Sequence, residues 1–120
     1  MLPEERDAAY LWDMLEAART VRGFVHQVTL EDYLSNQMLQ LAVEREMEII
    51  GEAARRISDT FKETHLHISW SRIVGLRNVL AHQYGSIIQE RIWAIAIENV
   101  PVLIATLEPL IPPLPPKSEP

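Results

Sequence analysis

The 120-residue sequence predicts an all-α fold, built as an up-and-down bundle of four to five helices. Three observations point to this class. Apolar residues recur at spacings of three and four over most of the chain, which places them on one face of a helix. Only four glycines interrupt this pattern, and no strand-like alternation persists. We expect residues 1–111 to form one domain and the proline-rich segment 112–120 to be a flexible tail.

The first helix is expected over Glu4–Val21. Within it, Leu11, Leu15 and Ala18 recur at spacings of three and four, which is typical of one buried stripe. Gly23 follows the last of these turns, and glycine is a common residue just beyond a helix C-terminus. We therefore expect the helix to stop near Gly23.

The second helix is expected to be long and to cover Thr29–Lys62. The stretch "TLED" supplies a threonine N-cap and acidic residues in the first turn, where they suit the helix dipole. No proline interrupts the run that follows. The small residues around Gly51 would let another backbone approach this helix. Its expected apolar seam is Leu30, Leu34, Met38, Leu41, Ile49, Ala53, Ile57 and Phe61.

Two further helices are expected in the second half of the chain. The third begins near Ser69 as N-cap and ends near Gly85. The fourth begins at Ser86, where Gln89 at the third following position fits a capping box. Pro101 lies inside this last run and should kink it or end it, because proline removes a helical hydrogen bond.

The composition narrows the class of protein. Apolar residues make up 48% and charged residues 23% of the chain, which is typical of a globular domain. There is no cysteine, so thiolate chemistry is excluded and nothing speaks for secretion. No apolar stretch is expected to reach the ~20 residues that span a bilayer, and we expect a cytoplasmic protein without a membrane partner. The net charge of −6 argues against coating nucleic acid by bulk electrostatics.

The third helix carries an unusual polar set among apolar residues: Arg77, Asn78, His82 and Tyr84. At ~100° per residue, Asn78 and His82 share one side of the helix, and Arg77 lies about 140° from His82. Such a helix contributes part of a cleft and not a whole active site. If two copies meet across a two-fold axis, two arginines and two histidines converge in one composite cleft.

These residue types suit RNA cleavage without a metal. Two imidazoles with an ordinary pKa of ~6.5 can act as base and acid near neutral pH. An arginine brings a permanent charge that can brace a phosphate while it is displaced. On residue types alone, a hydrogen-bonded structural network of Arg77, His82 and Tyr84 remains the alternative interpretation.

The chain also resembles a known family, the HepT toxins of the HEPN superfamily (higher eukaryotes and prokaryotes nucleotide-binding). The resemblance covers nearly the whole chain and rests on "ERE" followed by "EIIGEAARRIS", on Trp70, and on "GLRNVLAHQY". Its most specific part is the motif R-x4-H-x-Y, which Arg77, His82 and Tyr84 meet with no departure in spacing. Asn78 matches the polar residue that usually follows the motif arginine.

The resemblance implies a homodimeric, metal-independent endoribonuclease that needs no cofactor and acts as the toxin of a type VII toxin–antitoxin pair. Arg77, Asn78 and His82 would be its catalytic residues, and its substrate would be RNA, for instance a tRNA or an mRNA. Its partner would be an MntA-type minimal nucleotidyltransferase, the antitoxin, which transfers AMP from ATP to the motif tyrosine, here Tyr84. The alternative is a non-catalytic subunit that docks a nucleotidyltransferase and binds nucleotide or substrate.

Two other groups of polar residues offer weaker hypotheses. His65 and His67 could be read as a metal pair, but no third ligand lies nearby in the sequence, and we expect no metal. Glu48 and Glu52 could orient a motif residue from behind. Pairing on the surface with the neighbouring Arg55 and Arg56 is the alternative for these acids.

Overall fold

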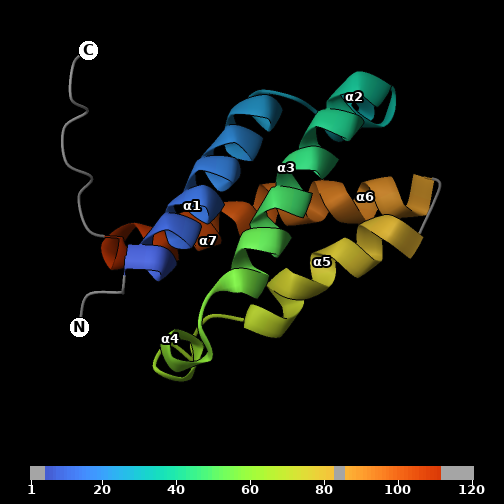
Figure 1. Cartoon of the computed structure of the whole chain (residues 1–120). Coiled ribbons are helices and arrows are strands. Elements are labelled where there is room, and N and C mark those ends of the chain that lie inside the picture. Colours follow the sequence, from blue (N-terminus) through green and yellow to red (C-terminus); the bar gives the residue numbers. More distant parts are fainter. Residues whose placement is uncertain (1–4, 83–85, 112–120) are drawn as a thin grey trace, which may run out of the picture.

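A computed structural model describes residues 5–82 and 86–111, and these residues form helices, turns and loops without a strand (Figure 1). The predicted all-α fold is confirmed. The tail 112–120 lies outside the described residues, so the domain boundary stays a prediction. The helices are α1 (Glu5–Val25), α2 (Leu30–Leu34), α3 (Gln37–Arg56), α4 (Asp59–Glu63), α5 (Trp70–His82), α6 (Ser86–Ala94), the π-helix η1 (Ile95–Asn99), α7 (Val100–Leu107) and the 3-10 turn η2 (Glu108–Leu110).

Helices α1 and α3 lie side by side and form the centre of the bundle, and α5 lies beside α3 (Figure 1). The buried face of α1 includes Leu11, Met14, Ala18 and Val21, each 0% exposed and spaced by three or four residues. The predicted stop at Gly23 is wrong, because α1 continues to Val25. The chain turns just beyond, where Gln27 takes the left-handed conformation with φ 59°.

The long second helix predicted over Thr29–Lys62 is wrong, because the structure divides it into α2, α3 and α4. Thr29 does cap α2, since its Oγ1 accepts a hydrogen bond from Asp32 N at 3.0 Å. A second cap, Asn36, starts α3 by accepting from Leu39 N at 3.0 Å. A third, Ser58, starts α4 by accepting from Phe61 N at 3.2 Å. Each cap satisfies a helix-terminal N–H group and so stabilises a new start.

A buried carboxylate holds the second of these breaks in place. Asp7 of α1 is 4% exposed and accepts hydrogen bonds from Ser58 N at 2.9 Å and from Ser58 Oγ at 2.6 Å. The first turn of α1 is thereby tied to the start of α4. The contact joins residues far apart in the sequence, which is why neither residue attracts attention when the sequence is read alone.

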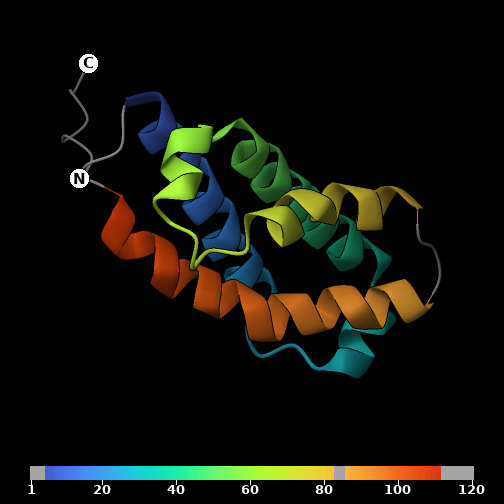
Figure 2. The same cartoon turned by 90° about the horizontal axis from the view of Figure 1, so that it is seen from below.

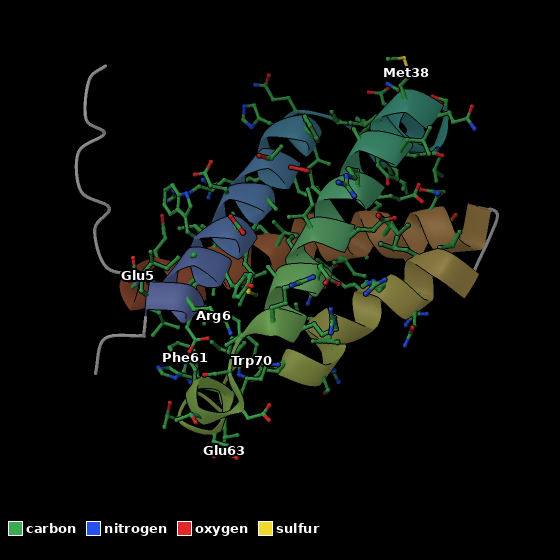
Figure 3. The ribbon with its side chains drawn as sticks, viewed as in Figure 1. Glu5, Arg6, Met38, Phe61, Glu63 and Trp70 are labelled. Atoms are coloured by element: carbon green, nitrogen blue, oxygen red, sulfur yellow. The ribbon has the colours of Figure 1, made fainter. Side chains whose placement is uncertain are left out.

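The breaks also change which residues of this region face the core. Met38 is 83% exposed and Leu41 is 59% exposed, so the predicted seam is wrong at these positions. Figure 3 shows Met38 projecting from the outer end of α3, away from the bundle. The buried face of α3 is instead Val43, Met47, Ile50, Gly51, Ala53 and Ala54.

Helix α6, the π-helix η1 and α7 join into one rod that runs along the bundle and contacts α1 and α2 (Figure 2). Pro101 does not end this rod. The backbone widens to a π turn just before it, and Val100 N bonds to Ile95 O across five residues. A π turn re-routes hydrogen bonds of the kind that a proline removes.

The rod differs from the sequence expectation in one further respect. Within the described residues, the run Ile88–Leu110 is long and apolar enough, by length and composition, to cross a membrane. One stripe of the rod is buried in the bundle and consists of Ile88, Ile92, Ala96, Val100, Ile104 and Leu107.

Candidate functional site

Helix α5 carries the polar motif and lies at the edge of the bundle. It is anchored at its first residue, because Trp70 is 8% exposed and its Nε1 donates to His65 O at 3.1 Å. Figure 3 shows Trp70 beside Phe61 of α4, and the two rings meet edge-on at 6.1 Å. From 71 to 80, every residue is half-buried or exposed, so contacts within one chain do not bury this helix although it is rich in apolar residues.

The backbones of α3 and α5 approach each other closely at Gly51. A Cβ atom at this position would lie 3.2 Å from the carbonyl oxygen of Ile73 and 3.4 Å from Cγ of Arg77. The first distance is shorter than an ordinary van der Waals contact, so an alanine would push α5 outward. Gly51, which is expected to let another backbone approach α3, therefore sets the position of Arg77.

The acid one residue further along α3 binds the motif arginine. Glu52 Oε2 accepts a hydrogen bond from Arg77 Nη1 at 2.8 Å. Its other oxygen, Oε1, accepts from Arg55 Nη2 at 2.8 Å and from Arg56 Nε at 2.9 Å. Glu52 therefore does both things considered for it. It pairs with Arg55 and Arg56 of its own helix, and it also orients Arg77 of α5.

This arrangement keeps Glu52 ionised and the arginines charged. Hydrogen bonds from Arg55 and then Arg56 lower the pKa of Glu52 from 4.5 to about 2. The same contacts raise the pKa of both guanidinium groups above their ordinary value. Glu52 thus works as a fixed negative charge, which holds three cations together that would otherwise repel one another.

The cluster forms one side of an open groove of about 540 Å³, which we call the arginine groove. Side chains of α1, α3 and α5 meet there, and nitrogen-bearing side chains are visible between α3 and α5 in Figure 3. Four arginines face three acids, a local excess of one positive charge in a chain whose net charge is −6. The lining residues are Tyr10, Asp13, Arg45, Glu48, Ile49, Glu52, Ala53, Arg55, Arg56 and Arg77.

The structure brings together only part of the predicted site. Arg77 lies in the arginine groove, and the neighbouring Asn78 is exposed on α5. His82 is the last residue of α5, but its side chain lies outside the described part of the structure. Tyr84 lies outside the described residues altogether. The catalytic roles of Arg77, Asn78 and His82 and the modification of Tyr84 stay predictions.

A second groove lies on another side of α5 and is largely apolar. It has a volume of about 670 Å³ and runs between α3, α5, η1 and α7. Leu76 and Val79 of α5 line it, and both side chains are half-buried. We call it the apolar groove; its other apolar lining residues include Met47, Ile50, Ile73, Ile95, Val100 and Leu103.

The histidine pair near α4 has a structural explanation. The ring of His65 stacks on Phe61 at 3.9 Å, and its Nδ1 lies 2.9 Å from Phe61 O. Among the described residues, no group of three or more histidine or acidic side chains is arranged to hold a metal. His65 therefore serves to pack the short helix α4 against its neighbours.

Gln89 near the start of α6 is used differently from the predicted capping box. Its Oε1 accepts a hydrogen bond from Tyr33 OH at 3.2 Å, and its Nε2 donates to Glu44 at 3.2 Å. Burial raises the pKa of the Tyr33 phenol well above its ordinary value, and the charge of Glu44 adds to the effect. This network joins α2, α3 and α6. The side chain of Ser86, the other member of the capping box, lies outside the described part of the structure.

The fold and the groove together define a class of protein, a helical bundle that presents a motif arginine in a small basic groove on an acidic chain. Comparison with known proteins agrees with this class. The family model described as "Ribonuclease HepT-like" matches residues 14–110. The chain therefore belongs to the HepT-like ribonuclease family.

Individual relatives are similar over most of their length. A Methanocaldococcus jannaschii protein named "Putative RNase MJ1380" is 39% identical over 100 residues, which cover 83% of this chain and 92% of the relative. A Thermococcus cleftensis protein named "Probable ribonuclease HepT" is 35% identical over 101 residues, covering 84% and 92%. No solved structure matches the chain.

Proposed function

We propose that the protein is a metal-independent endoribonuclease that acts as the toxin of a type VII toxin–antitoxin pair. The observation that carries this proposal is the position of Arg77. It heads the motif R-x4-H-x-Y, and Glu52 holds its guanidinium at 2.8 Å in the arginine groove. Membership of the HepT-like ribonuclease family supports the same activity.

The active site would be completed by a second copy of the chain. Helix α5 leaves the face with Leu76 and Val79 half-exposed beside the apolar groove, and such a face is typical of an interface between subunits. Pairing across a two-fold axis would bring the motif of α5 from each subunit into one cleft. Each copy would then supply one Arg77 and one His82.

The chemistry follows from these groups. One His82 accepts the proton of a ribose 2′-OH while the 2′-oxygen forms a bond to the adjacent phosphorus. The bond from phosphorus to the 5′-oxygen breaks, and the second His82, in its protonated form, gives its proton to that oxygen. The products are a 2′,3′-cyclic phosphate and a free 5′-OH. Arg77 stabilises the extra negative charge of the pentacoordinate phosphate, and Asn78 positions the strand.

A partner enzyme would control this activity. We expect an MntA-type nucleotidyltransferase to transfer AMP from ATP to the phenol oxygen of Tyr84, two residues beyond His82, with release of pyrophosphate. The added phosphate would compete with RNA for Arg77. After co-expression in the cytoplasm, mass analysis of digested protein should show a peptide containing Tyr84 heavier by one or more AMP units. An unmodified Tyr84 in a neutralised complex would mean that the antitoxin acts by covering the site.

A second candidate function is a non-catalytic subunit that docks a nucleotidyltransferase and binds a nucleotide in the arginine groove. The net charge of −6 favours this candidate, because it weakens attraction to a long RNA. Expression of the chain alone separates the two candidates. A ribonuclease toxin should stop growth until its partner is co-expressed, whereas a docking subunit should be harmless.

The direct test of the proposed activity is RNA cleavage by the purified protein in the presence of EDTA. Wild type should cut RNA under these conditions, and Arg77→Ala and His82→Ala should each abolish cutting and growth inhibition. Arg22→Gln on α1 is the control for loss of an exposed arginine and should keep activity. Retained toxicity in both motif variants would contradict the assignment.

A further inference from the structure

The arginine groove holds more cationic groups than the proposed reaction uses. Arg77 braces the reacting phosphate in the mechanism above. Arg55 and Arg56 have no part in it, although Glu52 joins them to Arg77 through contacts of 2.8 to 2.9 Å. Three guanidinium groups around one carboxylate leave two positive charges that the cluster does not neutralise.

Stabilisation of the fold does not account well for this cluster. The side chains of Arg55 and Arg56 are each 52% exposed, and exposed ion pairs typically contribute less than about 1 kcal/mol. A single carboxylate offsets only part of the repulsion among three guanidinium groups, and a further anion would offset more of it. A guanidinium has five N–H donors. Glu52 accepts hydrogen bonds from Nε and Nη2 of Arg55 and from Nε of Arg56. Both groups thus keep donors that do not contact Glu52.

The shape of the groove suits a chain of phosphates. Its volume of about 540 Å³ lies within the range of ligand-binding sites, and it is open to solvent along α3. From Arg45 to Arg56 the helix extends roughly 16 Å, at ~1.5 Å per residue. A groove of that length accommodates more than one phosphate of an extended strand.

We propose that Arg55 and Arg56 bind the phosphodiester groups that neighbour the one held by Arg77, so that the arginine groove is the track of the RNA strand into the cleft. Glu52 is the positioning residue of this track, because it sets the directions of all three guanidinium groups. The inference rests on the proposed function for the identity of the strand. By this proposal, α3 takes part in substrate binding beside α5, the helix that carries the motif.

The test is binding of a short 2′-O-methyl oligoribonucleotide, which lacks the attacking hydroxyl and is not cut. Affinity is measured over a series of salt concentrations for wild type, Arg55→Gln and Arg56→Gln. Each variant should bind several-fold more weakly, and its plot of log affinity against log salt should be shallower by about 0.7, the value for one lost contact to a single strand.

Arg22→Gln is the matched control, because it removes the same charge from an exposed position roughly 14 Å along α1 from Asp13 of the groove. It should leave the salt slope unchanged. Thermal unfolding of each variant checks that the fold is intact. If Arg55→Gln and Arg56→Gln bind the oligoribonucleotide with the same affinity and the same salt slope as the control, the proposal that these arginines form the track is contradicted.

The experiment separates this inference from the proposed function. A wild-type protein that cuts RNA while both variants keep the wild-type salt slope contradicts the track alone. If the wild-type protein does not cut RNA, but Arg55→Gln and Arg56→Gln show the weaker binding and the shallower salt slope, the proposed activity is contradicted. Phosphate binding by the arginine groove is then still supported.

Discussion

Helices α1 and α5 have similar apolar content in the sequence and very different surroundings in the structure. In α1, Leu11, Met14 and Val21 are all 0% exposed. In α5, Leu76, Val79 and Leu80 are only half-buried, and no residue from 71 to 80 is buried. The apolar face of α1 is fully buried by contacts within the chain. Helix α5 presents apolar side chains that one chain leaves partly exposed.

The difference separates the part of the molecule that holds the fold from the part that carries the chemistry. The core of α1 and α3 fixes Gly51 and Glu52, and these two residues place Arg77. The exposed face of α5 is available to a second subunit, as the proposed composite cleft requires. Three predictions test this division.

The first prediction compares leucine-to-alanine changes in the two helices. Leu11→Ala should lower the free energy of unfolding by about 2–5 kcal/mol, because it leaves a cavity in the core. Leu76→Ala should cost less than about 1.5 kcal/mol in dilute protein and should raise the dissociation constant of the dimer. Urea denaturation and sedimentation measure the two effects. Equal losses of stability in dilute protein would show that α5 belongs to the core.

The second prediction concerns the approach of α5 to α3. Gly51→Ala should destabilise the fold by about 1–2 kcal/mol and reduce RNA cutting, since the new methyl group displaces the backbone of α5 and Arg77. Gly23→Ala is the control. Nothing lies within 4 Å of its Cβ position, and the change should stabilise α1 by up to about 1 kcal/mol. A Gly51→Ala variant with wild-type stability and activity would contradict the close approach.

The third prediction uses pH. The pKa of Glu52 falls from 4.5 to about 2 in the fold, so its ion pairs stabilise the protein above pH 4.5 and are lost as pH falls toward 2. The stability advantage of wild type over Glu52→Gln should therefore be constant above pH 5 and shrink between pH 4.5 and 2. Glu48→Gln, which loses one pair at 3.6 Å, should change less. A constant gap across this range would show that Glu52 is not held by the arginines.

The sequence allowed the helical class to be predicted, but not the places where the helices break. Thr29 is recognised as a cap because acidic residues follow it. Asn36 and Ser58 lie inside an apolar pattern without proline, and Ser58 is held by Asp7, which is distant in the sequence. Each break changes which face of the following helix is buried, and this is why a seam predicted for one continuous helix is wrong at Met38 and Leu41.

The candidate site divides in the same way. The spacing of Arg77 and His82 is a local pattern, and the role of Gly51 as a point of approach was predictable from its small size. The convergence of Arg55, Arg56 and Arg77 on Glu52 depends on where α5 crosses α3. That crossing is a tertiary feature, and the run "EAARR" indicates it only once the packing is known.

The most direct test of the composite cleft is to mix wild-type and His82→Ala subunits, allow them to exchange, and measure RNA cutting. If the cleft needs His82 from both subunits, only wild-type homodimers are active, and an equal mixture should keep about a quarter of the wild-type activity. Activity that falls only to about half would mean that each subunit carries an independent site, and would contradict the account.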